Sequence, residues 1–226
     1  VLRLYRDAEK SNGWSTYFGS GKWILDLNGH AINNSPGDNW DTAFFQIAKY
    51  GDVTIVGDGA MNVYALVSVG ASLTVDGNCS FYKLEQQAGT LNVNSGSFES
   101  LIVAKLDVNY PFTRETKLCG GYYGDIKIVD IEGLTCADLL GSGYRFEGLT
   151  FEQAKATELK NVTVVACDHA NIGSDGSCPD CGKKFFLSVE ANGTTTLFDT
   201  FERAIRYAEQ NDGSTVKLLQ DLLLDN

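Results

Sequence analysis

The sequence predicts an all-β protein made of stacked coils, a parallel β-helix, followed by a small Cys/His knuckle and an amphipathic helix. Three observations support this prediction. A short phrase, a turn followed by alternating apolar residues, recurs three times between residues 51 and 98. The 226-residue chain contains 24 glycines against 3 prolines, a balance typical of many tight turns between strands. A group of cysteines with one histidine follows the repeats, and the clearest helical pattern comes after it.

The repeated phrase begins at Gly51, Gly70 and Ala88, at intervals of about 18 to 20 residues. Each copy has two apolar residues separated by one polar residue, which places the apolar pair on one face of a strand. A single strand of this kind cannot bury its apolar face, whereas stacked copies cover one another. The pattern therefore predicts inward-facing columns made of Val53, Ile55, Leu73, Val75, Leu91 and Val93.

The segments on either side of the repeats continue the strand pattern. Residues 1–7 read as an edge-like strand. Leu25 and Leu27 then alternate with their neighbours before Asn28-Gly29, a pair favoured in tight turns. An apolar segment at residues 44–48 precedes the repeats, and less regular strand-like segments follow them. We expect the stack to extend from about residue 23 to about residue 131.

Two phrases, LDLNGH at residues 25–30 and GYRF at 143–146, resemble those of a known family. They are similar to the right-handed parallel β-helix (pectin-lyase-like) modules repeated in large cell-wall-anchored surface proteins of Gram-positive gut bacteria. The resemblance implies a right-handed stack that ends in a short helix and a GY-x-F phrase. It also implies an extracellular location, either cell-wall-associated or secreted.

The section from residue 134 to 166 departs from the coil pattern. TCADLLG predicts one or two helical turns with Thr135 as the N-cap. GYRF returns to a strand, residues 150–161 form either a second short helix or a loop, and NVTVVA resumes as a strand from Asn161. We therefore assign residues 1–166 to the parallel β-helix with its closing short helix.

Cys167 and His169 are followed by Cys178 and Cys181 in a C-x-H…C-x-x-C pattern. Two thiolates on a Gly-flanked C-x-x-C turn can meet one ion, and the C-x-H pair can supply two more ligands from a facing strand end. Four protein ligands leave no open position, so the pattern predicts a structural zinc site in a knuckle segment, residues 167–189. The surface modules that the chain resembles contain the same pattern. The alternative is a disulfide, joining Cys178 to Cys181 or either of them to Cys167.

Residues 199–210 have the strongest helical pattern, with Asp199 as the N-cap, Glu202 completing a capping box and one apolar stripe. The strand TVKLLQD that follows matches VLRLYRD at the start of the chain, position by position. We therefore assign residues 190–226 to a helix and a strand that open the next module of a tandem array. The alternative is that they cover the end of the neighbouring stack as a cap.

Five aromatic residues are candidates for a sugar-stacking platform, because flat rings pack well against the apolar faces of sugars. The competing interpretation, which we favour, places them in the core or at the ends of the stack. The five are Trp14, Trp23, Trp40, Tyr122 and Tyr123.

The composition excludes some classes of partner. A net charge of −11 argues against nucleic acid and anionic lipid, since both are bound by basic surfaces. The sequence also lacks an apolar run approaching the roughly 20 residues that span a bilayer. We expect a non-catalytic module that acts as a rigid spacer or as an adhesin-like binder of host glycan or protein. Its other partners would be neighbouring modules of the same chain.

The alternative function is that of a polysaccharide lyase or glycoside hydrolase of the β-helix type. Such a lyase requires clustered carboxylates for Ca²⁺ with an Arg or Lys base, and a hydrolase requires paired carboxylates. The outward positions of the readable coils hold mostly Thr and Asn. Asp26, Asp58 and Asp76 are the acids with a spacing that would allow a column, although turn positions explain each of them separately.

Overall fold

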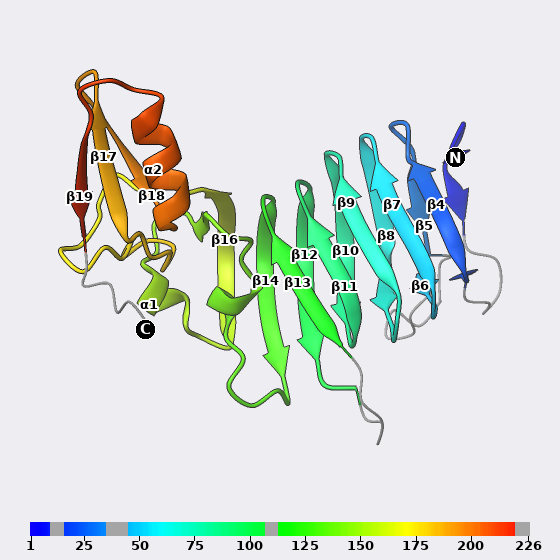
Figure 1. The fold of residues 1–226 in the computed structure, drawn as a ribbon. Coiled ribbons are helices and arrows are strands. Elements are labelled where there is room, and N and C mark those ends of the chain that lie inside the picture. The colour runs from blue at the N-terminus through cyan, green and yellow to red at the C-terminus, as the bar shows by residue number, and fades with distance from the viewer. Residues whose placement is uncertain (10–15, 35–44, 107–112, 220–226) are drawn as a thin grey trace.

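The computed structural model describes residues 1–9, 16–34, 45–106 and 113–219. Over these ranges the chain is mostly β, arranged in a six-stranded, a ten-stranded and a three-stranded sheet. Figure 1 shows the strands of the first two sheets side by side in a long row that starts near the N-terminus. The three-stranded sheet and helix α2 (Phe201–Glu209) lie at the opposite end of that row.

The six-stranded sheet is parallel throughout, because each strand pairs with its neighbour in the same direction. Its order is β1 (Leu2–Arg3), β4 (Gly21–Asp26), β7 (Gly51–Val56), β9 (Ser72–Asp76), β11 (Gly89–Val93) and β13 (Arg114–Leu118). The first strand is an edge strand, but it covers only Leu2–Arg3 of the predicted residues 1–7. Its parallel pairing with β4 also places the start of the stack before the predicted residue 23.

The ten-stranded sheet receives the second strand of each coil. Its main path runs through β2 (Ala8–Glu9), β5 (Ala31–Asn33), β8 (Gly59–Val67), β10 (Cys79–Gln86), β12 (Ser97–Ala104), β14 (Tyr122–Val129), β16 (Glu158–Ala166) and β15 (Tyr144–Phe146). A side branch contains β3 (Thr16–Phe18) and β6 (Phe45–Ile47). Strand β8 joins the two branches because its first part pairs with β5 and its last part with β6.

The pairing between coils keeps equivalent residues in columns. Val53 pairs with Leu73 and Leu73 with Leu91, while Ile55, Val75 and Val93 form the second column. All six side chains are 0% exposed, so the predicted inward assignment is confirmed. On the other sheet, Phe81, Phe98 and Tyr123 form an internal stack with ring centroids 4.9 and 5.0 Å apart. The core is therefore a continuous apolar column that lies between the six-stranded sheet and the parallel part of the ten-stranded sheet.

Parallel stacking ends at β14, close to the predicted limit. The next strand of the sheet, β16, pairs antiparallel with β14, and β15 pairs antiparallel with β16. The 3₁₀ helix η1 (Cys136–Leu139) begins after Thr135, as expected, and buries Cys136, Ala137 and Leu139 against the core. The short helix α1 (Phe151–Ala154) follows, with the Thr150 hydroxyl accepting a hydrogen bond from the Gln153 N–H.

The C-terminal part forms a sheet of its own, which includes residues on both sides of the predicted boundary between residues 189 and 190. Strand β17 (Leu187–Ala191) spans that boundary and pairs antiparallel with both β18 (Thr194–Phe198) and β19 (Thr215–Leu218). Helix α2 packs on this sheet through the buried Ala204. Strand β19 is therefore an edge strand of the three-stranded sheet, and residues 220–226 of the predicted segment lie outside the described residues.

The predicted N-cap of α2 is wrong by one residue. Helix α2 begins after Thr200, whose hydroxyl accepts a hydrogen bond from the Arg203 N–H. The Asp199 carboxylate instead contacts the Arg203 guanidinium at 2.7 Å and the Lys183 ammonium at 3.3 Å. Asp199 is therefore engaged by two cations, one of which comes from the Cys/His segment.

Candidate metal centre

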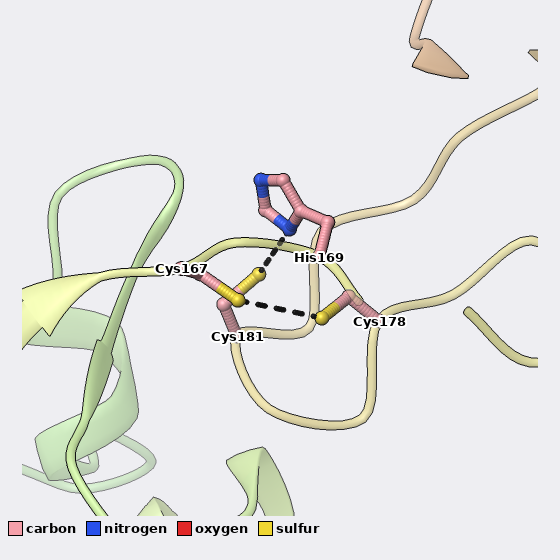
Figure 2. A group of neighbouring side chains, drawn as sticks. All are labelled: Cys167, His169, Cys178 and Cys181. Carbon is pink, nitrogen blue, oxygen red and sulfur yellow. Dashed lines mark hydrogen bonds between the residues drawn. The ribbon is translucent and has the colours of Figure 1, made fainter. Parts of the chain in front are cut away.

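The four residues of the C-x-H…C-x-x-C pattern come together at the point where the stack meets the C-terminal sheet. Cys167 follows β16 directly, and His169 lies two residues further along the chain. Cys178 and Cys181 lie on a tight turn that brings their sulfur atoms opposite the first pair, as Figure 2 shows. The backbone N–H of Cys167 donates to the carbonyl oxygen of Gly143 at 2.8 Å, which anchors the first ligand to the closing region.

The four ligand atoms all lie within 4.8 Å of one another. The Sγ atoms of Cys167 and Cys178 are 3.6 Å apart, and Cys181 Sγ lies 3.5 Å from His169 Nδ1. A tetrahedral ion with metal–sulfur bonds of about 2.3 Å separates two sulfur ligands by about 3.8 Å. The 3.6 and 3.5 Å contacts are close to the edges of such a tetrahedron, and all six cysteines of the chain are free thiols. The disulfide alternative is therefore not the arrangement seen here.

The backbone around the ligands adopts the turns that this arrangement requires. His169 has φ 55° and Gly182 has φ 71°, both in the left-handed region. The Gly182 N–H donates to the Cys178 carbonyl at 2.8 Å, and the Cys178 N–H donates to the Lys183 carbonyl at 2.9 Å. A Cβ on Gly182 would lie 2.8 Å from the Phe151 ring, so glycine is required for the turn and for its packing on α1.

Backbone N–H groups point at two of the sulfur atoms. The His169 N–H donates to Cys167 and the Lys183 N–H donates to Cys181, and each bond favours the thiolate. Burial acts in the opposite direction, raising the pKa of Cys167 and raising the pKa of Cys181 to about 12. Burial, with help from the Lys183 charge, lowers the pKa of His169 and favours the neutral imidazole that binds metals. A bound cation supplies the positive charge that holds such thiols as thiolates.

The surroundings of the ligands were not predicted from the sequence. The Phe185 ring meets the His169 ring edge-on at a centroid distance of 4.9 Å and is buried with Cys167 and Cys178 in a small cluster. The Phe151 N–H donates to the Pro179 carbonyl at 2.8 Å, which ties the turn to α1. The apolar pair that follows the turn, Phe185-Phe186, was the available sequence signal for this packing. With four inward ligands and this support, the Cys₃His cluster can bind a metal ion.

The other candidate residues from the sequence do not converge on a site. Tyr123 is fully buried in the ring stack, whereas Trp23 and Tyr122 are 39% and 43% exposed. Trp14 and Trp40 lie outside the described residues. Tyr123 therefore cannot contribute to a sugar-stacking platform. Its burial agrees with the competing interpretation, which places the aromatic residues in the core.

The suggested acid column is also not formed. Val56 pairs with both Asp26 and Asp76 and so separates the two acids, while Asp58 belongs to the following turn. The Asp26 carboxylate accepts a hydrogen bond from Arg3 at 2.7 Å and another from the Asn28 N–H at 3.0 Å. Asp26 therefore stabilises the first coil and its turn.

A comparison with protein-family models, curated proteins and solved structures found no match to this chain. Across the described residues, the helices are too short or too polar to cross a membrane.

Proposed function

We propose that this chain is a rigid, non-catalytic module of an extracellular bacterial surface protein, cell-wall-associated or secreted. In this proposal the two parallel sheets are the walls of a right-handed parallel β-helix, and the Cys₃His cluster holds a structural zinc ion. The module acts as a spacer or as an adhesin-like binder of host glycan or protein. The observation that carries the proposal is the regular register of the coils, in which each inward residue packs on its equivalent in the next coil.

The β-helix assignment is supported by the order in which the chain visits the two sheets. From β7 to β14, successive strands alternate between them, and neighbouring strands within each sheet are parallel over this range. Each coil then covers the apolar face of the coil before it, which is how quasi-one-dimensional folds bury a core. Stacked coils of this kind resist bending because every backbone group along the stack has a partner in the next coil. This property suits a spacer.

Zinc is the ion that the ligand set favours. Three thiolates with one imidazole form a common structural zinc site, and softer sulfur ligands disfavour Ca²⁺ and Mg²⁺. Four protein ligands complete the tetrahedron, so an ion held here has no position for water or substrate. The backbone N–H bonds to Cys167 and Cys181 are the kind of outer contacts that orient metal ligands. The role of the ion in this proposal is therefore to fix the fold.

The extracellular location and the host partner rest on the sequence resemblance, with the net charge of −11 as further support against nucleic-acid binding. Neighbouring modules of the same chain are the other partners in this proposal. The match between the strand at residues 215–221 and the strand at residues 1–7 supports a tandem arrangement.

The test is incubation of the purified chain with a panel of acidic and neutral polysaccharides and mucin glycans. Unsaturated products and new reducing ends are followed over time. The proposal predicts that neither is formed above the level seen with heat-denatured protein. Release of either product, abolished by substitution of one acidic residue, would instead identify a polysaccharide lyase or a glycoside hydrolase.

A further inference from the structure

A groove of about 780 Å³ crosses the outer face of the ten-stranded sheet. Its lining residues come from β2, β5, β8, β10, β12 and β14, which are consecutive neighbours in that sheet. With strands spaced by about 4.8 Å, the five intervals between these strands give a length of about 24 Å. The groove is therefore an extended feature that crosses consecutive strands of the sheet, and none of the cluster residues is among the described residues that line it.

The floor of the groove carries polar side chains in register. Ser80 pairs with Ser97, and Ser97 pairs with Tyr122. At one end of the groove Asn33 pairs with Asn62, and the Asn62 Nδ2 donates to the Asn33 Oδ1 at 2.7 Å. Beneath this polar layer lies the internal stack of Phe81, Phe98 and Tyr123. A rigid apolar core thus supports hydroxyl and amide groups at fixed spacing.

Asn34, which follows β5, also lines the groove and is unusual because it is buried. The residue is only 9% exposed, and neither its amide nitrogen nor its amide oxygen has a hydrogen-bond partner among the described residues. An unpaired buried amide lowers the stability of the folded chain. Groups that are kept at such a cost belong disproportionately to functional sites. A small rotation of this side chain toward the groove would give both atoms a partner on a bound ligand, with no existing hydrogen bond to break.

The charges in the groove select among ligands. Its charged side chains are the carboxylates of Glu9 and Glu99, and neither Lys nor Arg is among the described residues that line it. Phosphates, sulfates, sialic acids and uronic acids would meet negative charge here without a cation to offset it. Acidic ligands are therefore disfavoured, and the amide and hydroxyl side chains of the groove favour a ligand with many groups that both donate and accept hydrogen bonds. Sugar hydroxyls have this property, and amide and hydroxyl side chains are their natural partners.

The exposed ring of Tyr122 completes the site. Its side chain is 43% exposed, and its hydroxyl donates to Asn161 Oδ1 at 2.9 Å, which fixes the ring at one end of the groove. A held aromatic face packs against the apolar face of a sugar ring with little loss of side-chain entropy. From these observations we infer that the groove is a binding site for a neutral oligosaccharide several residues long. The inference deepens the proposed function, on which it rests, by naming the ligand class and the face that binds it.

The test is binding of the whole chain to matched oligosaccharides by calorimetry and on a glycan array. Neutral glucan, mannan, galactan and N-acetyllactosamine chains are compared with polygalacturonate, sialylated chains and heparin. The expected result is retention of at least one neutral chain and of no acidic one. Asn62→Ala should weaken that binding about ten-fold, which corresponds to about one lost hydrogen bond. Asn92→Ala, an outward asparagine on the other sheet, is the matched control and should leave binding unchanged.

Asn34→Leu separates a binding role from a structural one. Loss of an unpaired buried amide should keep or raise the melting temperature, while binding of the neutral chain falls. A lower melting temperature with unchanged binding would assign Asn34 a structural role and remove it from the site. Retention of acidic chains only, of host protein only or of no glycan would overturn the inference, as would binding that Asn62→Ala and Tyr122→Ala leave intact. Turnover of a bound neutral chain would contradict the non-catalytic proposal and leave the groove assignment in place.

Discussion

The stacked coils and the Cys/His knuckle differ in how many side chains they bury. In the coils, every inward side chain of the three repeats is fully buried, and one core cluster includes residues from Phe18 to Val164. In the knuckle, the separate buried cluster consists of Cys167, Cys178 and Phe185. A segment with so few buried side chains cannot offset the conformational entropy of its ordered backbone by burial alone.

This contrast is the reason that the proposal assigns a bound metal ion to the knuckle and not to the coils. A coil gains stability from each neighbour, so adding coils is sufficient. The knuckle buries only a small cluster, and its turns hold left-handed backbone at His169 and Gly182. The three predictions below test this difference, beginning with the largest expected effect.

Val75→Asp should be severely destabilising, by more than about 4 kcal/mol in the free energy of unfolding. The reason is that Val75 is 0% exposed and has Ile55 and Val93 as neighbours in its column. Urea denaturation followed by circular dichroism measures the change. Thr74→Asp introduces the same charge one residue away on the outer face and should cost less than about 1 kcal/mol. Equal effects of the two changes would remove the basis for the inward assignment.

Cys181→Ser should abolish metal binding and leave the coils folded. Protein purified without chelator should contain about one zinc ion per chain, and the variant almost none, because one sulfur ligand is lost. Mass-spectrometric metal analysis checks this result. Cys119→Ser is the control: Cys119 is half-buried on the stack outside the cluster, and its loss should leave the zinc content unchanged. A variant with full zinc content would show that Cys181 is not a ligand.

Thr200→Ala should have the smallest effect, a loss of about 1 kcal/mol in the free energy of unfolding. The substitution removes the hydroxyl that accepts from the Arg203 N–H at the start of α2. Thermal unfolding of the C-terminal sheet measures this loss of stability. Thr195→Ala, at an exposed position on β18, is the reference. If both substitutions have the same effect, the hydroxyl contributes nothing measurable as a cap.

The coils were predictable because apolar and polar residues alternate strictly in the repeated phrase. Leu73 and Val75 are apolar on either side of Thr74, and the same order recurs in the neighbouring coils. The knuckle was predictable because structural zinc sites use Cys and His ligands at short, recognisable spacings in many different folds. Both signals are local in sequence, which is why no knowledge of long-range pairing was needed.

The second sheet was harder to predict because its alternation is interrupted. The register between β10 and β8 shifts between Phe81 and Lys83, so that Tyr82 and Lys83 are both half-buried. Such a shift depends on pairing across coils, and no single strand reveals it. For the same reason the groove residues Asn34 and Asn62 could not be grouped from the sequence. The cap of α2 was misassigned because the Lys183 that engages Asp199 comes from a segment remote in sequence.

Hydrogen–deuterium exchange of the whole chain, with zinc bound and after chelation, tests the contrast between coils and knuckle most directly. The account predicts that amides of residues 167–186 lose their protection on chelation, because the metal replaces a core there. Amides of the coils at residues 51–104 should exchange equally slowly in both states. Unchanged protection of the knuckle after removal of zinc, or equal loss of protection in the coils, would contradict it.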